Sequence, residues 1–354
     1  MKKTRVLIAA GGTGGHVFPA LAIADELRNN GHDVIWLGSG GIEMDVAPAH
    51  GFPLEIVPFS PPKGFVGALR LTMACWRAQF VIRRIRPDVI LGMGGYAATP
   101  GCFAAKSFGI PVVIHEQNAV GGRANQVLTQ LAKHTLGGFP DAFSDLQWVG
   151  NPVRKKFLTG AAPANRVCNC HTRRLLILGG SQGAELLNSV VPAALGQTND
   201  SFDVFHQCGR GNIERTKSAY NNAKKQAKII EFIDDVAEQM MVADLIICRA
   251  GAATLAEIAA VGAPALLVPY PYATDDHQSH NARFFDERDA AFVCSSGEFK
   301  SAWLADFLTA MTREQLLLKA NNAKALARPK AAELVAQICI DEAEVRKSML
   351  LKVK

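Results

Sequence analysis

The strongest constraint on the fold is a pattern that occurs twice along the chain. Residues 87–118 read as an apolar strand, a glycine loop, a helix of small residues, a Gly-x-Pro break and a second strand, and residues 243–273 repeat that order. The segments TRVLIAAGGTGGH and RRLLILGGSQGAELLN form a second matching pair. Strands that alternate with helices in this way indicate parallel sheets wrapped by helices. The predicted fold class is therefore α/β, with two Rossmann-like domains.

The predicted domain boundary lies near residues 149–157, where an Asn-Pro pair interrupts the pattern. We assign residues 1–153 to one domain and 154–330 to the other, and expect a helix over 331–354 to pack back on the first. Ligands of open parallel sheets bind beyond the carboxyl ends of the strands. Two domains that face each other across a cleft would therefore gather all four glycine loops there.

Composition excludes several classes of protein. Apolar residues make up 49% of the 354 positions and charged residues 20%, which argues against long disordered segments. The net charge of +6 is spread over both halves, so no nucleic-acid partner is expected. The apolar run at residues 6–10 is too short for an export signal, and no segment is long enough to span a membrane. We expect a cytoplasmic protein.

No metal or cofactor is expected from the residues. The eight cysteines are scattered, as is typical of reduced thiols. The tight group at residues 168–171, CNCH, lacks a second ligand pair and predicts a surface loop rather than a zinc site. There is no D-x-D triplet to carry a metal–diphosphate pair, and neither the EMD at 43–45 nor Asp275 with Asp276 is a good substitute.

The first glycine loop, GGTGG at residues 11–15, ends at His16. A dinucleotide clamp is disfavoured because its third glycine position is occupied by Val17, and because the next strand ends without an acidic residue for the ribose. A tight turn without a ligand is the remaining structural alternative.

The second half of the chain carries a better phosphate-binding loop. Ser181 and Gln182 supply donors within residues 179–188, and the following helix presents its positive end, although the lysine of a P-loop is missing. Arg249 could pair with a diphosphate, and Glu257 could accept both ribose hydroxyls or simply be a solvated helix residue. The amide-rich residues 274–282 suit sugar hydroxyls, or else a polar loop that caps the next helix.

Eight motifs in this order carry a resemblance to a known family: GGTGGHVFPALA, GMGGYAATPG, HEQNAVGGRAN, GNPVR, GGSQGA, EFIDDV, CRAGAATLAE and DDHQSHNA. Over residues 5–282 the chain resembles the peripheral-membrane N-acetylglucosaminyltransferases of peptidoglycan synthesis. The resemblance implies a GT-B fold and inverting transfer of N-acetylglucosamine from UDP-N-acetylglucosamine to the muramoyl 4-hydroxyl of lipid I, undecaprenyl-diphospho-muramoylpentapeptide. The products would be lipid II and UDP, and the reaction would need no metal.

The resemblance also implies a donor site with contributions from both domains. Its members would be Thr13, Gly14, Gly15, Asn118, Arg154, Ser181, Ile233, Ala252, Ala253, Thr254, Leu255, Ala256, Glu257 and Gln278. Ser181 would meet the diphosphate, Arg154 would reach the donor from the hinge, and the backbone of Ile233 would contact uracil. Glu257 would bind the ribose and Gln278 the sugar hydroxyls. His277 departs from the second glutamine of some members, which leaves the recognition of those hydroxyls open.

The reaction needs a base for the acceptor hydroxyl, and His16 is our hypothesis for that base or for a group that positions the acceptor. An imidazole has a reference pKa of about 6.5, so it can be neutral and accept a proton near pH 7. His115 and Glu116 are rival bases. A histidine that merely caps the first helical turn is the structural alternative.

Residues 63–87 form a basic amphipathic stretch without an acidic residue. Phe65, Leu69, Met73, Trp76 and Phe80 recur at helical spacing. Such a stretch is typical of contact with anionic lipid, which predicts a peripheral protein on the cytoplasmic face of the inner membrane; a core-facing stripe is the alternative.

Two other functions remain open on the sequence: a UDP-N-acetylglucosamine 2-epimerase with the same two-domain plan, and a nucleotide-sugar-binding protein without enzymatic activity. The partners expected are UDP-N-acetylglucosamine, lipid I, the anionic membrane surface and, as candidates, other cell-wall synthesis proteins.

Overall fold

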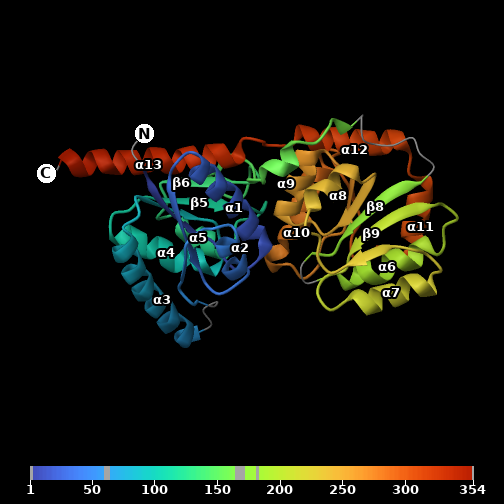
Figure 1. The fold of residues 1–354 in the computed structure, drawn as a ribbon, viewed down its shortest axis with the longest axis horizontal. Helices are drawn as coiled ribbons and strands as arrows, with labels where there is room; N and C mark the ends of the chain where they lie inside the picture. Colours follow the sequence, from blue (N-terminus) through green and yellow to red (C-terminus); the bar gives the residue numbers. More distant parts are fainter. Residues whose placement is uncertain (1–2, 60–63, 164–171, 181–182, 353–354) are drawn as a thin grey trace. The chain divides into compact units, whose positions relative to one another are not determined.

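The computed structural model describes residues 3–59, 64–163, 172–180 and 183–352, without the side chains of residues 64–66, 96 and 97. The chain divides into two compact units (Figure 1). Unit 1 consists of Met1–Arg154 and Arg328–Lys354, and unit 2 of Lys155–Ala327.

Unit 1 is a parallel sheet between two layers of helices. Its strands are β1 (Arg5–Ala9), β2 (Asp33–Gly38), β3 (Leu54–Ile56), β4 (Val89–Gly92), β5 (Val112–Glu116), β6 (His134–Gly137) and β7 (Gln147–Trp148). Its helices are α1 (Gly14–Asn29), α2 (Glu43–Ala49), α3 (Gly64–Ile85), α4 (Gly95–Ser107), α5 (Arg123–Leu128) and α13 (Ala331–Lys352). The strands lie in the order β3-β2-β1-β4-β5-β6-β7.

Both faces of this sheet are buried, as its apolar strands predict. Along β1, Val6 and Ile8 pack into the layer formed with α1 and α13, while Leu7 and Ala9 pack into the layer formed with α3 and α4. This alternation follows from the two-residue period of a strand. The loops at the strand ends are therefore carried on a rigid, two-sided core.

Unit 2 repeats the plan of unit 1. Its strands are β8 (Arg173–Leu178), β9 (Phe202–Gln207), β10 (Lys228–Ile230), β11 (Leu245–Cys248), β12 (Ala265–Leu267) and β13 (Phe292–Val293). Its helices are η1 (Lys155–Leu158), α6 (Glu185–Leu195), α7 (Ile213–Asn222), α8 (Val236–Val242), α9 (Ala252–Val261), η3 (Thr274–Asp276), α10 (His277–Asp286), α11 (Ser301–Ala310) and α12 (Arg313–Ala325).

The strand order of unit 2, β10-β9-β8-β11-β12-β13, matches β3-β2-β1-β4-β5-β6 of unit 1, and all pairs in both sheets are parallel. Strands β1 and β8 occupy equivalent positions, as do β4 and β11. These are the two pairs of segments that the sequence pattern matched, so the prediction of two Rossmann-like sheets is confirmed.

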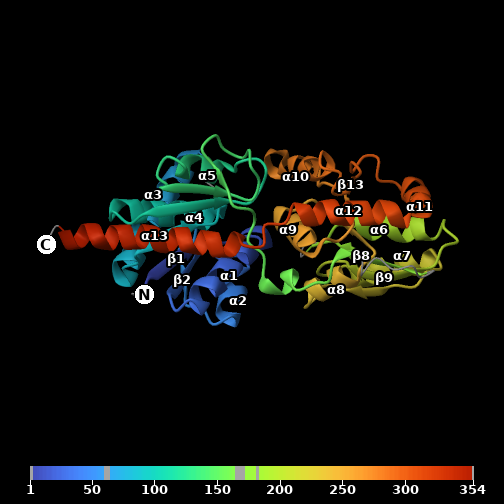
Figure 2. The same cartoon turned by 90° about the horizontal axis from the view of Figure 1, so that it is seen from above.

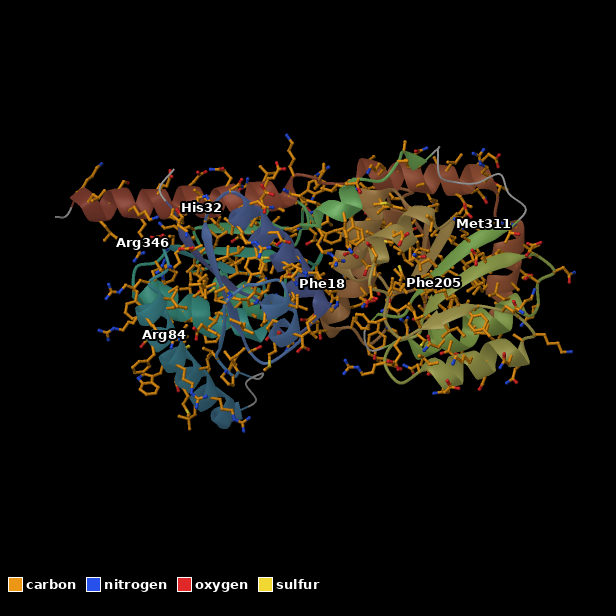
Figure 3. All side chains as sticks on the ribbon, in the orientation of Figure 1. Phe18, His32, Arg84, Phe205, Met311 and Arg346 are labelled. Atoms are coloured by element: carbon orange, nitrogen blue, oxygen red, sulfur yellow. The ribbon has the colours of Figure 1, made fainter. Side chains whose placement is uncertain are left out.

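The last helix, α13, belongs to unit 1 although it follows unit 2 in sequence. It runs beside α1, and Val335, Cys339 and Ala343 are buried in the same core layer (Figure 2). Near its end the guanidinium of Arg346, labelled in Figure 3, donates hydrogen bonds to the carbonyl oxygens of Pro87 (3.1 Å) and Gly109 (3.1 Å). Arg346 thus ties α13 to the segments that follow α3 and α4.

We expect Arg346→Ala to lower the free energy of unfolding by about 2 kcal/mol, because carbonyl groups at two chain turns lose a charged donor. Urea denaturation measures this loss. The matched control is Arg83→Ala, which removes an exposed arginine of α3 in the same unit and should change stability by less than about 0.5 kcal/mol. Equal effects of the two substitutions would show that Arg346 does not anchor α13.

Candidate functional site

The predicted site residues of unit 1 lie at one edge of its sheet. Strands β1, β4 and β5 are parallel neighbours, so their carboxyl ends meet at this edge. Residues 13–16 follow β1, Gly95 follows β4, and Asn118 follows β5. A Cβ atom added at Gly95 would lie 2.7 Å from the carbonyl oxygen of Gly11, so the loops after β1 and β4 are in direct contact.

The loops after β1 and β2 together hold the carboxylate of Glu43, the first residue of α2. Its Oε1 atom accepts hydrogen bonds from the backbone N–H groups of residues 39–41 at 2.8–2.9 Å, and its Oε2 atom accepts one from Gly12 at 2.9 Å. Glu43 is completely buried. One carboxylate therefore ties together the loops that follow β1 and β2.

This carboxylate explains why the loop is rich in glycine. A Cβ atom at Gly11 would lie 2.6 Å from Oε1 of Glu43, and one at Gly41 would lie 2.7 Å from Oε2 and from the backbone of Gly12. Gly12 itself has a φ of +93°, which disfavours any other residue. At these positions the group that approaches the backbone closely is a side chain of the protein itself.

The charge of Glu43 is set by two opposing effects. Burial raises the pKa of its carboxyl group, but the hydrogen bonds from the backbone of Gly41, Gly12 and Ser39 outweigh burial and bring the pKa below its usual value. Glu43 is consequently ionised at neutral pH. A negative charge beside the first turn of α1 also suits the positive end of that helix.

His16 lies in the first turn of α1 and bonds across to the loop after β5. Its Nδ1 atom is 2.7 Å from Oε1 of Gln117. Cβ atoms added at Gly94 and Gly95 would lie 3.1 Å and 3.4 Å from the imidazole ring, so these glycines pack against the ring. The ring is half-buried, and within the described residues its Nε2 atom makes no hydrogen bond.

His115, one of the two rival bases, is completely buried. Its Nε2 atom lies 3.0 Å from the carbonyl oxygen of Gly150, and its Nδ1 atom lies 3.1 Å from Nε2 of Gln117. Burial lowers its pKa to about 4, although the bond to Gly150 acts in the opposite direction. His115 is therefore neutral and has both ring nitrogens engaged.

The other rival, Glu116, is 3% exposed and holds its own loop together. Its carboxylate accepts hydrogen bonds from the backbone of Asn118 (3.0 Å) and Gly122 (3.1 Å) and from Nδ2 of Asn125 (2.8 Å). These contacts use both carboxylate oxygens and hold the side chain within its own loop. Among the three candidates, His16 has a ring nitrogen that makes no hydrogen bond within the described residues, and its role as the base stays a prediction.

Three other predicted residues of unit 1 have definite surroundings. Thr13 is exposed and precedes α1 without a side-chain capping bond. The Nδ2 atom of Asn118 lies 3.2 Å from Oε1 of Glu116. The guanidinium of Arg154, the last residue of this part of unit 1, lies 4.9 Å from the ring centre of Phe18 on α1, which Figure 3 labels. Their roles toward a ligand stay predictions.

The predicted residues of unit 2 also follow strand ends. Helix α9 follows β11, and its N-cap, Gly251, makes no side-chain capping bond, so the N–H groups of the first turn can meet an anion. Ala252 and Leu255 are buried, whereas Ala253, Thr254, Ala256 and Glu257 are half-buried. Ile233 is buried beside the exposed Phe232, after β10. Ser181, with Gln182, lies outside the described residues.

Arg249 has a structural role that the sequence did not predict. Its Nη1 atom donates to the carbonyl oxygens of Val268 (3.0 Å) and Pro269 (3.1 Å) and to Oγ of Ser296 (2.9 Å). Burial lowers the pKa of the guanidinium, though not enough to neutralise it near pH 7. One nitrogen of Arg249 is thus committed to the loop after β12, and diphosphate binding by the rest stays a prediction.

The loop at residues 274–282 is held by its own polar groups. Oε1 of Gln278 accepts a hydrogen bond from the backbone N–H of Tyr270 (3.0 Å), and the predicted contact of Gln278 with a sugar stays a prediction. Asp275 and Asp276 have φ values of +51° and +52°, a conformation that few non-glycine residues adopt. The loop thus leads directly into α10, and its backbone conformation places Gln278 in the first turn of that helix.

Helix α3 presents two separate apolar faces. One face, with Ala74, Ala78 and Ile82, is buried in the core of unit 1. The other exposes more than half of most of its side chains: Leu69 57%, Met73 50%, Trp76 61% and Phe80 56%. These four residues of the predicted stripe are therefore exposed and do not belong to the core. The side chain of Phe65, the fifth residue, lies outside the described part of the chain. No helix in the described part of the chain is long and apolar enough to cross a bilayer.

Two residues with central contacts in unit 1, Glu43 and Gln117, were not predicted as site residues. Glu43 was weighed only as part of a poor metal motif, although a lone glutamate after GSGG was a signal for an anion enclosed by glycines. Gln117 stands inside the HEQN motif but was given no role. Among the described residues no group of three or more His, Cys, Asp or Glu side chains could hold a metal; residues 168–171 are not described.

Comparisons with known proteins give the family. The description of the glycosyltransferase family 28 N-terminal domain matches residues 6–136, and that of the glycosyltransferase family 28 C-terminal domain matches residues 174–338. A UDP-N-acetylglucosamine–N-acetylmuramyl-(pentapeptide) pyrophosphoryl-undecaprenol N-acetylglucosamine transferase from Aromatoleum aromaticum is 43% identical over 97% of this chain and 99% of its own length. The protein of the same name from Dechloromonas aromatica is 44% identical over 97% of this chain and 100% of its own length.

Solved structures agree with these sequences. A crystal structure of MurG from Acinetobacter baumannii is 36% identical, with a TM-score of 0.83 over 96% of this chain and 99% of that chain. The calicheamicin glycosyltransferase CalG4 is 15% identical, with a TM-score of 0.64 over 99% of this chain and 100% of that chain, and supports the fold alone.

We expect Glu43→Ala to lower the free energy of unfolding by about 3 kcal/mol at pH 7, because four backbone N–H groups lose the acceptor that they share. The loss should shrink in acid. The lowered pKa of Glu43 means that its stabilisation is complete above the unfolded-state pKa of about 4.3 and disappears as the pH falls through the folded-state pKa. Urea denaturation at several pH values measures both. Asp45→Ala, an exposed carboxylate on the same helix, is the control; a loss no larger than the control's would contradict the prediction.

Proposed function

The chain belongs to glycosyltransferase family 28, and from this we propose that it transfers N-acetylglucosamine from UDP-N-acetylglucosamine to the muramoyl 4-hydroxyl of undecaprenyl-diphospho-muramoylpentapeptide. It is a glycosyltransferase with the GT-B fold and two Rossmann-like units. The observation that carries the substrate assignment is the identity of 43–44% over nearly the whole length of relatives named for this activity.

The acceptor side of the reaction falls to the loops of unit 1. The muramoyl 4-hydroxyl attacks the anomeric carbon of the donor sugar, the bond from that carbon to the diphosphate oxygen breaks, and UDP leaves with the electron pair. The hydroxyl proton must go to a base. His16 suits this role because it is half-buried, packed in place by Gly94 and Gly95, and has Nε2 without a hydrogen bond in the described structure.

The donor side falls to unit 2. The open N-terminus of α9 and the donors of residues 181 and 182 would meet the negative charge that develops on UDP. Because Ala252 and Leu255 are buried, they would contribute backbone rather than side-chain contacts. Glu257 would accept from the ribose hydroxyls, and the amide nitrogen of Gln278 would donate to the sugar.

Membrane contact would be made by the exposed apolar face of α3. Trp76 and Phe80 pack edge to face, with ring centres 4.5 Å apart, and extend the face along the helix. Arg70 and Arg77 are exposed on the same helix and would attract anionic headgroups. This arrangement suits peripheral binding to the cytoplasmic face of the inner membrane, where a polyprenyl-linked acceptor is reached without a spanning helix.

The reaction is tested by release of UDP from UDP-N-acetylglucosamine with and without a lipid I analogue, repeated in EDTA. We expect release that requires the acceptor and survives EDTA, and His16→Ala should lower kcat at least about a hundredfold. His50→Ala, an exposed histidine of the same unit, is the control.

Donor binding without acceptor-dependent release would contradict the transfer and favour a binding protein, while epimerised free sugar would favour the epimerase. Wild-type turnover and acceptor KM in His16→Ala would remove His16 from the mechanism.

Sedimentation with vesicles tests the contact with lipid. Changing Leu69, Trp76 and Phe80 together to Ser should abolish binding to vesicles that contain anionic phospholipid, because the exposed apolar area is lost. A control that changes the exposed Val242 and Leu318 of unit 2 to Ser should bind like the wild type. Unchanged binding by the triple variant would refute a membrane role for α3.

A further inference from the structure

Four groups in unit 1 form a continuous row of hydrogen bonds. The row runs from the carbonyl oxygen of Gly150 to Nε2 of His115 (3.0 Å), from Nδ1 of His115 to Nε2 of Gln117 (3.1 Å), and from Oε1 of Gln117 to Nδ1 of His16 (2.7 Å). It connects the predicted base to the backbone through side chains that are themselves buried, since His115 is 0% and Gln117 1% exposed.

The direction of each bond follows from one backbone carbonyl. The amide nitrogen of Gln117 lies 3.1 Å from the carbonyl oxygen of His115, which can only accept a hydrogen bond. The amide group is therefore oriented with its NH2 toward His115 and its oxygen toward His16. The reverse orientation would set two acceptor oxygens against each other in a buried place.

This orientation determines which nitrogen of each imidazole carries the proton. The NH2 group of Gln117 donates to Nδ1 of His115, so His115 carries its proton on Nε2 and donates it to Gly150. The amide oxygen of Gln117 accepts from His16, so His16 carries a proton on Nδ1. In its neutral form His16 then has its lone pair on Nε2.

Contacts from Asn151, Gly94 and Gly95 hold two members of this row in place. Nδ2 of Asn151 donates to the carbonyl oxygen of Gln117 at 2.9 Å, which holds the glutamine backbone. Gly94 and Gly95 pack against the ring of His16, with φ values of +81° and +71° that favour glycine. A ring that packs against two glycines and is bonded at Nδ1 keeps Nε2 as its open nitrogen.

We propose that Gln117 is a positioning residue that holds His16 in the Nδ1–H form, so that Nε2 is the atom that takes the proton of the acceptor hydroxyl. The inference rests on the proposed function. In the transfer, Nε2 gains that proton while the oxygen–carbon bond forms and the bond to UDP breaks. The amide oxygen keeps its bond to Nδ1–H before and after the proton arrives, and it orients the ring without adding a charge beside it.

The tautomer can be measured without any activity. Nitrogen-15 NMR of protein labelled at histidine distinguishes the two ring nitrogens, and the His16 signals are those that disappear in His16→Asn. We expect the neutral imidazole of His16 in the wild type to carry its proton on Nδ1. In Gln117→Met, which has similar size but neither donor nor acceptor, we expect the population to move toward Nε2–H, the form that free imidazole side chains prefer in water.

Kinetics provide the second readout. Gln117→Met should lower kcat about tenfold to a hundredfold with little change in donor KM, because fewer molecules present the basic nitrogen to the acceptor. Gln117→Glu keeps an oxygen opposite Nδ1 and should retain the Nδ1–H form. Its negative charge favours the imidazolium, so the acidic limb of the pH–rate profile should move to higher pH. Gln130→Met, at an exposed position of the same unit, is the control and should behave like the wild type.

The outcomes separate this inference from the proposed function. A wild-type His16 with its proton on Nε2, or an unchanged tautomer in Gln117→Met, overturns the role of Gln117 whatever the activity. An unmoved pH–rate profile in Gln117→Glu, in protein that still shows wild-type tautomers and stability, also overturns it. Absence of acceptor-dependent UDP release in the wild type would instead remove the proposed reaction and leave the measured tautomer standing.

Discussion

The architecture of unit 1 around its candidate site depends on the buried carboxylate of Glu43. A charge removed from water persists only when hydrogen bonds replace its hydration, and here the backbone of two loops supplies them. The loops must come so close to the carboxylate that side chains are excluded at Gly11 and Gly41. The start of α1 is thereby fixed, and His16 in its first turn is brought against the loop after β5.

At other strand ends, amide side chains connect neighbouring segments by hydrogen bonds. Gln117 connects two histidines, Asn125 bonds to Glu116, and in unit 2 Nδ2 of Asn281 donates to the carbonyl oxygen of Ala250 at 3.1 Å. An amide both donates and accepts without carrying charge, so it can join backbone and side chain in a buried place at little electrostatic cost. Rigid loops of this kind keep reacting groups positioned before a substrate arrives.

The same internal bonds change how polar motifs are interpreted. Arg249 and Gln278 were predicted to face a ligand. In the structure each also forms hydrogen bonds with the backbone of the loop after β12. Glu116 and His115, which were predicted as rival bases, both form hydrogen bonds within unit 1 through the atoms that would accept a proton. Residue type and spacing alone overstate how many polar groups near a strand end are open to a substrate.

The sequence by itself determined the two parallel sheets, the positions of the glycine loops and the candidacy of His16, because strand period, helix period and glycine content are local properties of the chain. Tertiary structure decided which partner each polar group takes. Glu43 accepts a hydrogen bond from Gly12, 31 residues earlier in the chain, and His16 bonds to Gln117, 101 residues later. Helix α13 belongs to unit 1 although all of unit 2 comes before it in the sequence. Packing between distant segments selects such partners and leaves no periodic pattern in either segment. Only the folded chain therefore shows that Gln117 forms a hydrogen bond with His16.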